Sequence, residues 1–245
     1  MNAETGYTVF AHDARTARWA KAAAKVADGL ADDPAVKRAN LRHGNTWFVG
    51  VDLLPNDANG AVDGVPLAGP WQSHVPNLAQ HAAQVSIIYP GYPQQDPDQS
   101  DANHRYRVDR MAAHVDGLLP EGAAHRRFPR EFHAYILGIP LNENDAAPTV
   151  VWPGSHRIMQ AALRTAIGDS DPADVDVTDA YHAARRAVFD SCQPVRIHAK
   201  PGQSFLIHRF ALHGTAPWQE PPQAGRMIAF FRPEFQSARR WLDDL

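Results

Sequence analysis

Residues that form turns recur along the whole chain and limit the folds that it can adopt. The 245 residues include 20 prolines and 16 glycines. Proline interrupts helices and glycine favours turns, so this composition suits many short strands better than a helical bundle. The chain is also 44% hydrophobic, which is enough for a full core, and one domain is the default at this length. We therefore expect one mainly β domain.

Apolar patterns predict where the elements lie. Residues 1–80 are expected to form an extension of helix and strand that packs on the core, and residues 155–192 a helical insertion. A double-sheet jelly roll with helices outside satisfies this order. We expect strands within residues 46–54, 84–89, 104–116, 132–141, 149–152, 195–199 and 205–208. We expect helices at 16–30, 70–84, 155–168 and 177–190.

Charge and cysteine content exclude several classes of protein. A net charge of −3 argues against a general nucleic-acid binder, which needs a basic face. The single Cys192 excludes an internal disulfide framework and a cysteine-based zinc site. There is no run of 18 apolar residues and no apolar signal core, so we expect a cytoplasmic protein without a membrane partner. Glycine-rich nucleotide loops and the usual protease and hydrolase motifs are absent.

A His-x-Asp triplet at residues 114–116 is the strongest chemical signal. In an extended strand, positions i and i+2 point the same way, so His114 and Asp116 would converge as two ligands of a divalent metal. His213 offers a third ligand, and His208, five residues earlier, is an alternative. Two histidines and one carboxylate leave the opposite face of a metal open. This arrangement suits Fe(II) that must also hold a co-substrate and dioxygen.

The order of these motifs resembles the phytanoyl-CoA dioxygenase-like branch of the Fe(II)/2-oxoglutarate oxygenases. The resemblance covers roughly residues 85–235, and its matching pieces are residues 113–117, 150–156, 201–207 and 213–226. It implies a double-stranded β-helix, or cupin-like jelly roll, as a single domain over residues 1–245. It also implies Fe(II) held by His114, Asp116 and His213, with 2-oxoglutarate as co-substrate.

Further site residues follow from this resemblance. Arg226 is the expected anchor of the distal 2-oxoglutarate carboxylate, because a guanidinium gives two parallel charge-assisted hydrogen bonds. Arg232 is the alternative anchor, although we expect it to end its strand in solvent. Tyr89 is expected to hydrogen-bond 2-oxoglutarate, and Trp152 and His208 to lie at the substrate pocket.

Six arginines flank the triplet. Such a charge run is usually a solvated face, and an anionic substrate is the alternative interpretation. These residues are Arg105, Arg107, Arg110, Arg126, Arg127 and Arg130.

The motifs together predict an oxygenase that uses dioxygen and 2-oxoglutarate to hydroxylate a small-molecule substrate, with release of succinate and CO2. Asp116 favours hydroxylation, because related halogenases have Ala or Gly at that position and so leave room for chloride. The alternative is a cupin-type lyase or isomerase that uses its metal as a Lewis acid and needs no 2-oxoglutarate. Dependence on 2-oxoglutarate distinguishes the two.

Overall fold

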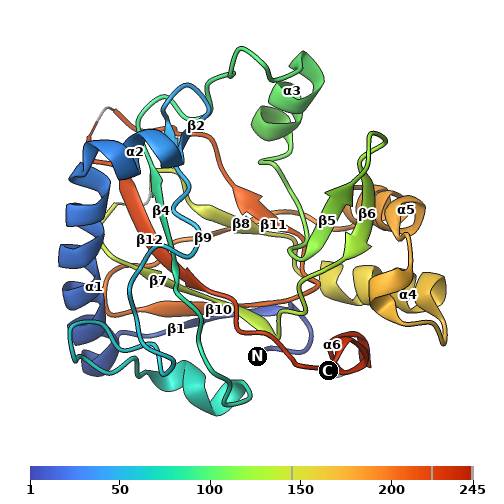
Figure 1. The fold of residues 1–245 in the computed structure, drawn as a ribbon, viewed down its shortest axis with the longest axis horizontal. Helices are drawn as coiled ribbons and strands as arrows, with labels where there is room; N and C mark the ends of the chain where they lie inside the picture. The colour runs from blue at the N-terminus through green and yellow to red at the C-terminus, as the bar shows by residue number, and fades with distance from the viewer. Residues whose placement is uncertain (145, 222, 244–245) are drawn as a thin grey trace.

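Two antiparallel β-sheets and a set of flanking helices make up the fold (Figure 1). The structure is a computed structural model that describes residues 1–144, 146–221 and 223–243. The large sheet has the strand order β1-β10-β7-β12-β4-β3-β2. Its strands are β1 (Tyr7–Phe10), β2 (Leu41–Arg42), β3 (Trp47–Phe48), β4 (Gln84–Ile88), β7 (Tyr135–Pro140), β10 (Ser204–His208) and β12 (Arg226–Phe231).

The small sheet has the order β11-β8-β9, and β5 and β6 form a separate hairpin. These strands are β11 (His213–Thr215), β8 (Thr149–Val151), β9 (Val195–Ile197), β5 (Leu118–Glu121) and β6 (Arg126–Pro129). The helices are α1 (Ala14–Asp32), α2 (Pro34–Asn40), α3 (Asp101–Asp109), α4 (Ser155–Ile167), α5 (Thr178–Ser191) and α6 (Ala238–Asp243), with short 3-10 turns at Pro70–His74 and Pro172–Asp174.

The inner faces of the two sheets pack against each other. One buried cluster joins side chains of β7, β10 and β12 in the large sheet to Val151 of β8 and Ile197 of β9 in the small sheet. Apolar burial of this kind is the main force that holds two sheets face to face. The sheets therefore form a jelly roll whose interior is apolar around Val151 and Ile197.

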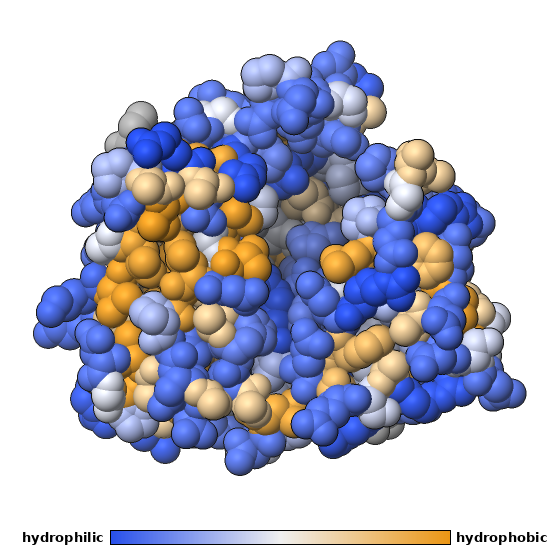
Figure 2. All heavy atoms as spheres, in the orientation of Figure 1, coloured by the Kyte–Doolittle hydropathy of each residue, from blue (hydrophilic) through white to orange (hydrophobic). Residues whose placement is uncertain are grey.

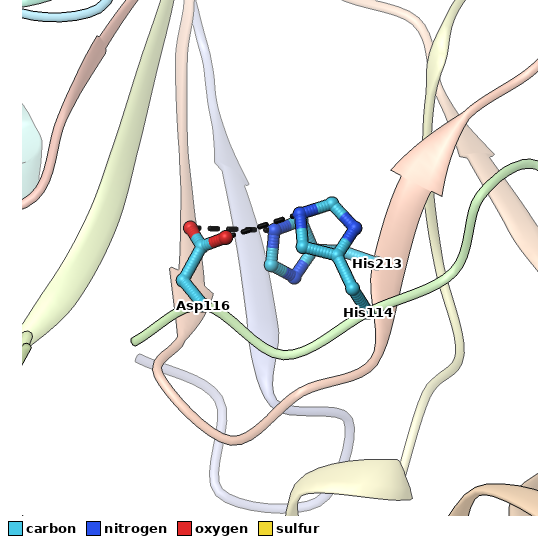
Figure 3. Close-up of side chains that lie close together, drawn as sticks. All are labelled: His114, Asp116 and His213. Carbon is cyan, nitrogen blue, oxygen red and sulfur yellow. Dashed lines mark ion pairs between the residues drawn. The ribbon is translucent and has the colours of Figure 1, made fainter. Parts of the chain in front are cut away.

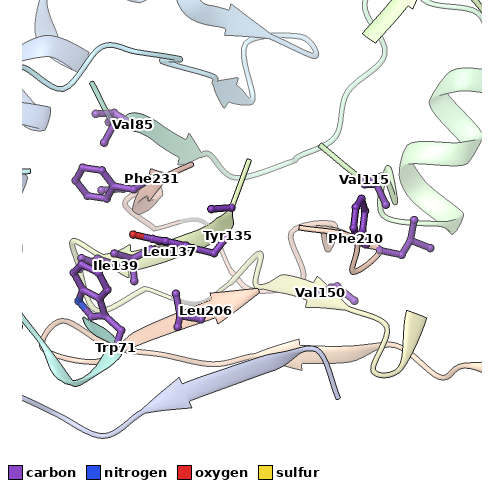
Figure 4. Close-up of a cluster of buried hydrophobic side chains, with 14 of the residues drawn as sticks. Trp71, Val85, Val115, Tyr135, Leu137, Ile139, Val150, Leu206, Phe210 and Phe231 are labelled. Atoms are coloured by element: carbon purple, nitrogen blue, oxygen red, sulfur yellow. The ribbon is translucent and has the colours of Figure 1, made fainter. Parts of the chain in front are cut away.

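The outer face of the large sheet is covered largely by α1. Asp13 caps this helix by accepting hydrogen bonds from the backbone N–H groups of Arg15 and Thr16. The helix buries a stripe of small residues and Trp19, whose ring lies 5.4 Å from that of Phe231. Figure 4 shows the outer side chains of the sheet, such as Leu137 and Leu206, in the same large core. Because β1, β2 and β3 join the large sheet, the first 80 residues form part of its framework.

Most predicted elements are present, and three are wrong or much shorter than expected. Strands at 84–89, 132–141, 149–152, 195–199 and 205–208 and helices at 16–30, 155–168 and 177–190 are confirmed to within a few residues. The helix expected at 70–84 stops at His74, since Pro76 follows closely and cannot donate a helical hydrogen bond. The strand expected at 46–54 is limited to Trp47–Phe48, because Gly50 and Asp52 adopt left-handed conformations.

The strand predicted at 104–116 is replaced by a helix and a turn. Ser100 caps α3 by accepting from the Asn103 backbone N–H, and Asp101 lies in the first turn, where the helix dipole favours a negative charge. Met111 and Ala112 then take left-handed conformations and end the segment in a tight turn.

No helix in the described ranges is both long enough and apolar enough to cross a membrane.

The Trp19 contact gives a test of how firmly α1 is attached. Trp19 is fully buried and donates a 2.7 Å hydrogen bond from Nε1 to the Gly60 carbonyl oxygen. We expect Trp19→Ala to lower the free energy of unfolding by roughly 3–5 kcal/mol, as measured by urea denaturation. The control Val51→Ala, at a side chain that is 59% exposed, should change it by about 0.5 kcal/mol or less. Equal effects of the two substitutions would contradict the packing described here.

Candidate metal centre

His114, Asp116 and His213 point toward one another at the open end of the jelly roll (Figure 3). His114 Nε2 lies 3.0 Å from Asp116 Oδ1, and His213 Nε2 lies 3.6 Å from Asp116 Oδ2. The three possible ligand atoms all lie within 4.8 Å of one another. Metal–ligand bonds of about 2.1 Å at right angles would place neighbouring ligand atoms roughly 3 Å apart. The set is therefore close to the geometry that one divalent ion requires.

Backbone carbonyl groups fix both imidazole rings. His114 Nδ1 lies 2.9 Å from the Ala112 carbonyl oxygen, and His213 Nδ1 lies 2.9 Å from the Ala211 carbonyl oxygen. A carbonyl oxygen only accepts, so Nδ1 carries the proton in each ring. Nε2 is then the nitrogen of each ring that faces Asp116, and it is the nitrogen that would bind a metal.

The two histidines are held together by their own backbones. His114 and His213 form an isolated antiparallel bridge, with N···O distances of 2.8 and 3.0 Å in the two directions. Beside it, Gly214 approaches the Met111 carbonyl oxygen so closely that an added Cβ would lie 2.1 Å from it. Glycine is therefore required after His213, because a larger residue would push the two ligand segments apart.

Asp116 reaches the same point from a turn. Gly117 has φ +80°, and an added Cβ there would lie 2.3 Å from the Glu131 carbonyl oxygen. The Gly117 carbonyl oxygen accepts a 2.8 Å hydrogen bond from the Arg130 backbone N–H. The predicted triplet thus converges, although through a bridge followed by a turn and not through the continuous strand that we expected.

Arg232 holds the carboxylate of Asp116. Arg232 Nε donates a 2.6 Å hydrogen bond to Asp116 Oδ2. Burial alone would raise the pKa of Asp116, but Arg232 and His213 outweigh it and hold the pKa well below its usual value. The expectation that Arg232 ends its strand in solvent is wrong, because its side chain is only 19% exposed.

The triad opens into a cleft of about 480 Å³. Figure 2 shows the hollow near the centre of this face, with hydrophilic residues around much of its opening. His114 is half-exposed toward solvent, whereas Asp116 and His213 are largely buried. A volume of this size is typical of a small-molecule site.

Arg226 lies between the two sheets, at a small cavity separate from this cleft. Its side chain is fully buried, and none of its three guanidinium nitrogens has a hydrogen-bond partner among the described residues. Burial lowers its pKa to about 10. Thr149 lines both the cleft and the small cavity beside Arg226, and its buried hydroxyl also lacks a partner within the described ranges. Buried polar groups of this kind are rare unless something else satisfies them.

Tyr89 and Trp152 do not lie where we expected them. The Tyr89 ring faces away from the cleft, with Lys37 Nζ 5.9 Å from its centroid. Trp152 is buried in the large core against Phe189, with ring centroids 5.8 Å apart, and it does not line the cleft. Their positions do not support the predicted contacts with 2-oxoglutarate and substrate.

His208 also lies away from the cleft. Its ring packs 4.9 Å from the ring of His156, and its Nδ1 accepts a hydrogen bond from the Phe210 backbone N–H. Burial, reinforced by Arg209, lowers its pKa to about 3. The structure therefore groups His213 with the triplet, and it does not support a pocket role for His208.

The six flanking arginines disperse in space. Arg126 pairs with Asp176 and Asp179, and Arg130 pairs with Glu121, on the outside of the hairpin. Arg107 is the member of this set that lines the cleft. It donates a 3.0 Å hydrogen bond to the Tyr92 hydroxyl and lies over the Trp47 ring. An anionic substrate therefore receives little support from this cluster.

Sequence reasoning missed several cleft residues, namely Ser86, Glu131, His133 and Thr149. Thr149 and Ser86 lie on strands buried on both faces, so no alternation marks their direction. Arg232, which we had named as the alternative anchor, also lines the cleft, directly after the end of β12.

Comparisons with known proteins are informative at the level of the fold. No protein-family model matches the sequence, and no curated protein matches it significantly. The structure of AviO1 from Streptomyces viridochromogenes Tue57 is similar, with a TM-score of 0.51 and 13% identity, over 96% of this chain and 92% of that chain. This likeness extends over nearly all of both chains and shows a shared fold.

Two further solved structures are similar at lower scores. EctD from S. alaskensis, solved with bound Fe, has a TM-score of 0.46 and 16% identity, over 94% of this chain and 73% of its own. The non-heme alpha ketoglutarate dependent carbocyclase SnoK, from nogalamycin biosynthesis, has a TM-score of 0.36 and 14% identity, over 64% and 54%.

The fold of the chain is a double-stranded β-helix with flanking helices, as the motifs predicted. The chain shares this fold with AviO1, and it carries the predicted His-x-Asp…His triad.

The triad gives a direct test of metal binding. We expect His114→Ala, Asp116→Ala and His213→Ala each to weaken Co(II) binding by roughly 100-fold or more, since losing even an outer partner of a ligand costs about 10–100-fold. Anaerobic calorimetric titration measures the affinity, and circular dichroism checks the fold. His208→Ala is the matched control and should bind Co(II) like the unmodified protein. Loss of binding in His208→Ala with retention in His213→Ala would show that the third ligand is misassigned.

The lowered pKa of His208 predicts how the stability of the protein falls in acid. Because its pKa is lowered from about 6.5 in the unfolded chain to about 3, its contribution to stability is complete above pH 6.5 and is lost as the pH falls toward 3. By pH 4.5 the loss should be about 2–3 kcal/mol. We expect His208→Asn, which keeps an acceptor near the Phe210 N–H, to reduce the fall in unfolding free energy between pH 7 and 4.5 by that amount. His125→Asn, at an exposed turn, should leave it unchanged.

Proposed function

We propose that this protein is a non-haem Fe(II)/2-oxoglutarate-dependent dioxygenase that hydroxylates a small-molecule substrate. The observation that carries the proposal is the buried guanidinium of Arg226, which has no partner among the described residues. It lines a small cavity that shares Thr149 with the cleft of the two-histidine, one-carboxylate triad. A buried charge without a partner is costly, and a ligand carboxylate would remove that cost. The triad suits Fe(II), and Arg226 suits the distal carboxylate of 2-oxoglutarate.

The chain's own residues define how the two groups would be held. His114 and His213 would donate Nε2, and Asp116 would donate the oxygen that Arg232 does not occupy. Arg226 would form two parallel hydrogen bonds with the distal carboxylate, and the unpartnered Thr149 hydroxyl, which lines both spaces, would donate to the same co-substrate. EctD structures have been solved with bound Fe and with 2-oxoglutarate.

When bound, Fe(II) and 2-oxoglutarate supply the oxidising chemistry, in which dioxygen and 2-oxoglutarate are consumed, succinate and CO2 are released, and a substrate C–H becomes C–OH. The protein contributes positioning. The bridge between His114 and His213 and the hydrogen bond from Arg232 hold the three ligands before metal arrives. The half-exposed side of His114 leaves the substrate an approach from the cleft. We also propose that residues 1–245 act as one oxygenase domain, because their first strands complete the large sheet.

Arg226 distinguishes this function from a lyase or isomerase that uses only the metal. We expect Arg226→Ala to weaken 2-oxoglutarate binding by about two to three orders of magnitude, since each charge-assisted hydrogen bond is worth roughly 1.5–3 kcal/mol. Arg226→Lys should lose most of that affinity as well, because an ammonium cannot form the planar fork. Anaerobic titration of 2-oxoglutarate into the Fe(II) protein, read at the charge-transfer band, gives the affinity. Arg196→Lys, an exposed arginine on β9, is the control.

Three results would contradict the proposal: no binding of 2-oxoglutarate by the unmodified protein, normal binding by Arg226→Ala, or oxygen uptake that is independent of 2-oxoglutarate.

A stability measurement tests whether the unpartnered guanidinium of Arg226 destabilises the free protein. Since the free protein buries this guanidinium without a partner, we expect Arg226→Met to keep or raise its unfolding free energy, by up to about 1–3 kcal/mol, while abolishing 2-oxoglutarate binding.

A further inference from the structure

Three carboxylates gather on one wall of the cleft, apart from the metal ligand Asp116. They are Asp52, Glu131 and Glu234, and all three line the cleft. Among the described residues, each forms its ion pair with a histidine. Asp52 lies 3.1 Å from His81, while Glu131 and Glu234 lie 3.5 and 3.9 Å from His133. Together they form what we call the acidic wall.

His133 does not neutralise the two glutamates at ordinary pH. His133 is 5% exposed, and burial lowers its pKa to about 4, so it is uncharged at neutral pH. The two glutamates therefore face a neutral ring between them. The pKa of Glu131 is raised by burial and by the nearby charges of Asp116 and Glu234. Glu131 and Glu234 thus repel each other across this neutral ring.

His133 is itself incompletely bonded. Its side chain lines the cleft, and its buried Nδ1 has no hydrogen-bond partner among the described residues. A buried nitrogen of this kind is normally satisfied by a protein group, by water or by a ligand. It is an observation independent of the carboxylates, and it indicates that a polar group from outside the chain completes this wall.

The acidic wall adjoins the metal centre through Arg232. The Arg232 carbonyl oxygen accepts a 2.9 Å hydrogen bond from His81 Nε2, while its guanidinium is bound to Asp116. Glu234 lies two residues further along the chain, in a bridge with His133. Arg107, the other cation that lines the cleft, contacts Tyr92 and Trp47 instead. The wall therefore places the carboxylates of Glu131 and Glu234 next to the triad.

We propose that the cleft binds a substrate with a cationic group, an alkylammonium or a guanidinium, which is seated against Asp52, Glu131 and Glu234 beside the metal triad. This inference rests on the proposed function in so far as the bound molecule is the one oxidised. The cation would replace the repulsion among the carboxylates with charge-assisted hydrogen bonds. It would also hold the adjacent carbons of the substrate in the open space next to His114.

The test measures binding without turnover. The Co(II)-loaded protein, in the absence of 2-oxoglutarate, is titrated calorimetrically with pentylammonium, agmatine and pentylguanidinium. Pentanol and pentanoate are the neutral and anionic probes of matched length. We expect at least one cation to bind tenfold or more tightly than both matched probes, and its affinity to fall when NaCl is raised from 50 to 500 mM. Comparison of the pentylammonium and pentylguanidinium affinities shows which of the two cationic groups the acidic wall binds more tightly.

Charge removal on the wall supplies the decisive comparison. Glu131→Gln and Glu234→Gln should each weaken cation binding about tenfold while leaving Co(II) affinity and pentanol binding unchanged. Glu121→Gln removes an equal charge on the outer hairpin and should have no effect. The proposal is overturned if no cation outbinds its matched probes, if pentanoate binds best, or if the wall variants behave like Glu121→Gln.

The outcome is separable from that of the proposed function. The 2-oxoglutarate titration depends on Arg226, whereas the cation titration depends on Glu131 and Glu234. Cation selectivity without 2-oxoglutarate binding would leave a cation-binding metal site and remove the oxygenase. Binding of 2-oxoglutarate without cation selectivity would retain the oxygenase and remove this substrate class.

Discussion

The backbone bridge between His114 and His213 is the contact on which the site depends. Two hydrogen bonds join a turn after α3 to strand β11 of the small sheet. The same bridge sets the direction of both imidazoles, because each Nδ1 hydrogen-bonds to a carbonyl oxygen two residues earlier in its own segment. Gly214 makes this close approach possible. Asp116, Arg232 and the acidic wall are then arranged around ligands that the main chain has already placed.

The interior of the jelly roll combines two environments. Near Val151 and Ile197 it is packed with apolar side chains, as a stable core requires. Around Arg226 and Thr149 it holds polar groups that have no partner among the described residues. Each such group costs free energy in the unliganded protein. Local departures of this kind from good packing are typical of functional sites, where a ligand completes what the fold leaves unsatisfied.

Much of the fold and the triad could be predicted from the sequence, and the errors have identifiable causes. The apolar runs located the central strands, because a buried strand needs apolar side chains whichever strands lie beside it. The strand predicted before His114 was wrong because Ser100 and Asp101 provide a local helix start, which outweighs the family pattern. Tyr89 and His208 were misplaced for another reason. Strands β4 and β10 are buried on both faces, so their sequences do not show which side chains face the cleft.

The separation of the bridged histidines along the chain has a consequence for folding. Positions 114 and 213 differ by 99 residues, and α4, α5 and both β8 and β10 lie between them. Contacts of such long range form only after the intervening chain has been ordered, because closing a long loop costs entropy that later contacts must offset. A nascent chain that ends at residue 212 has two of the three ligands but not the strand against which His114 is aligned. Assembly of the triad therefore requires that β11 of the small sheet has reached the turn after α3.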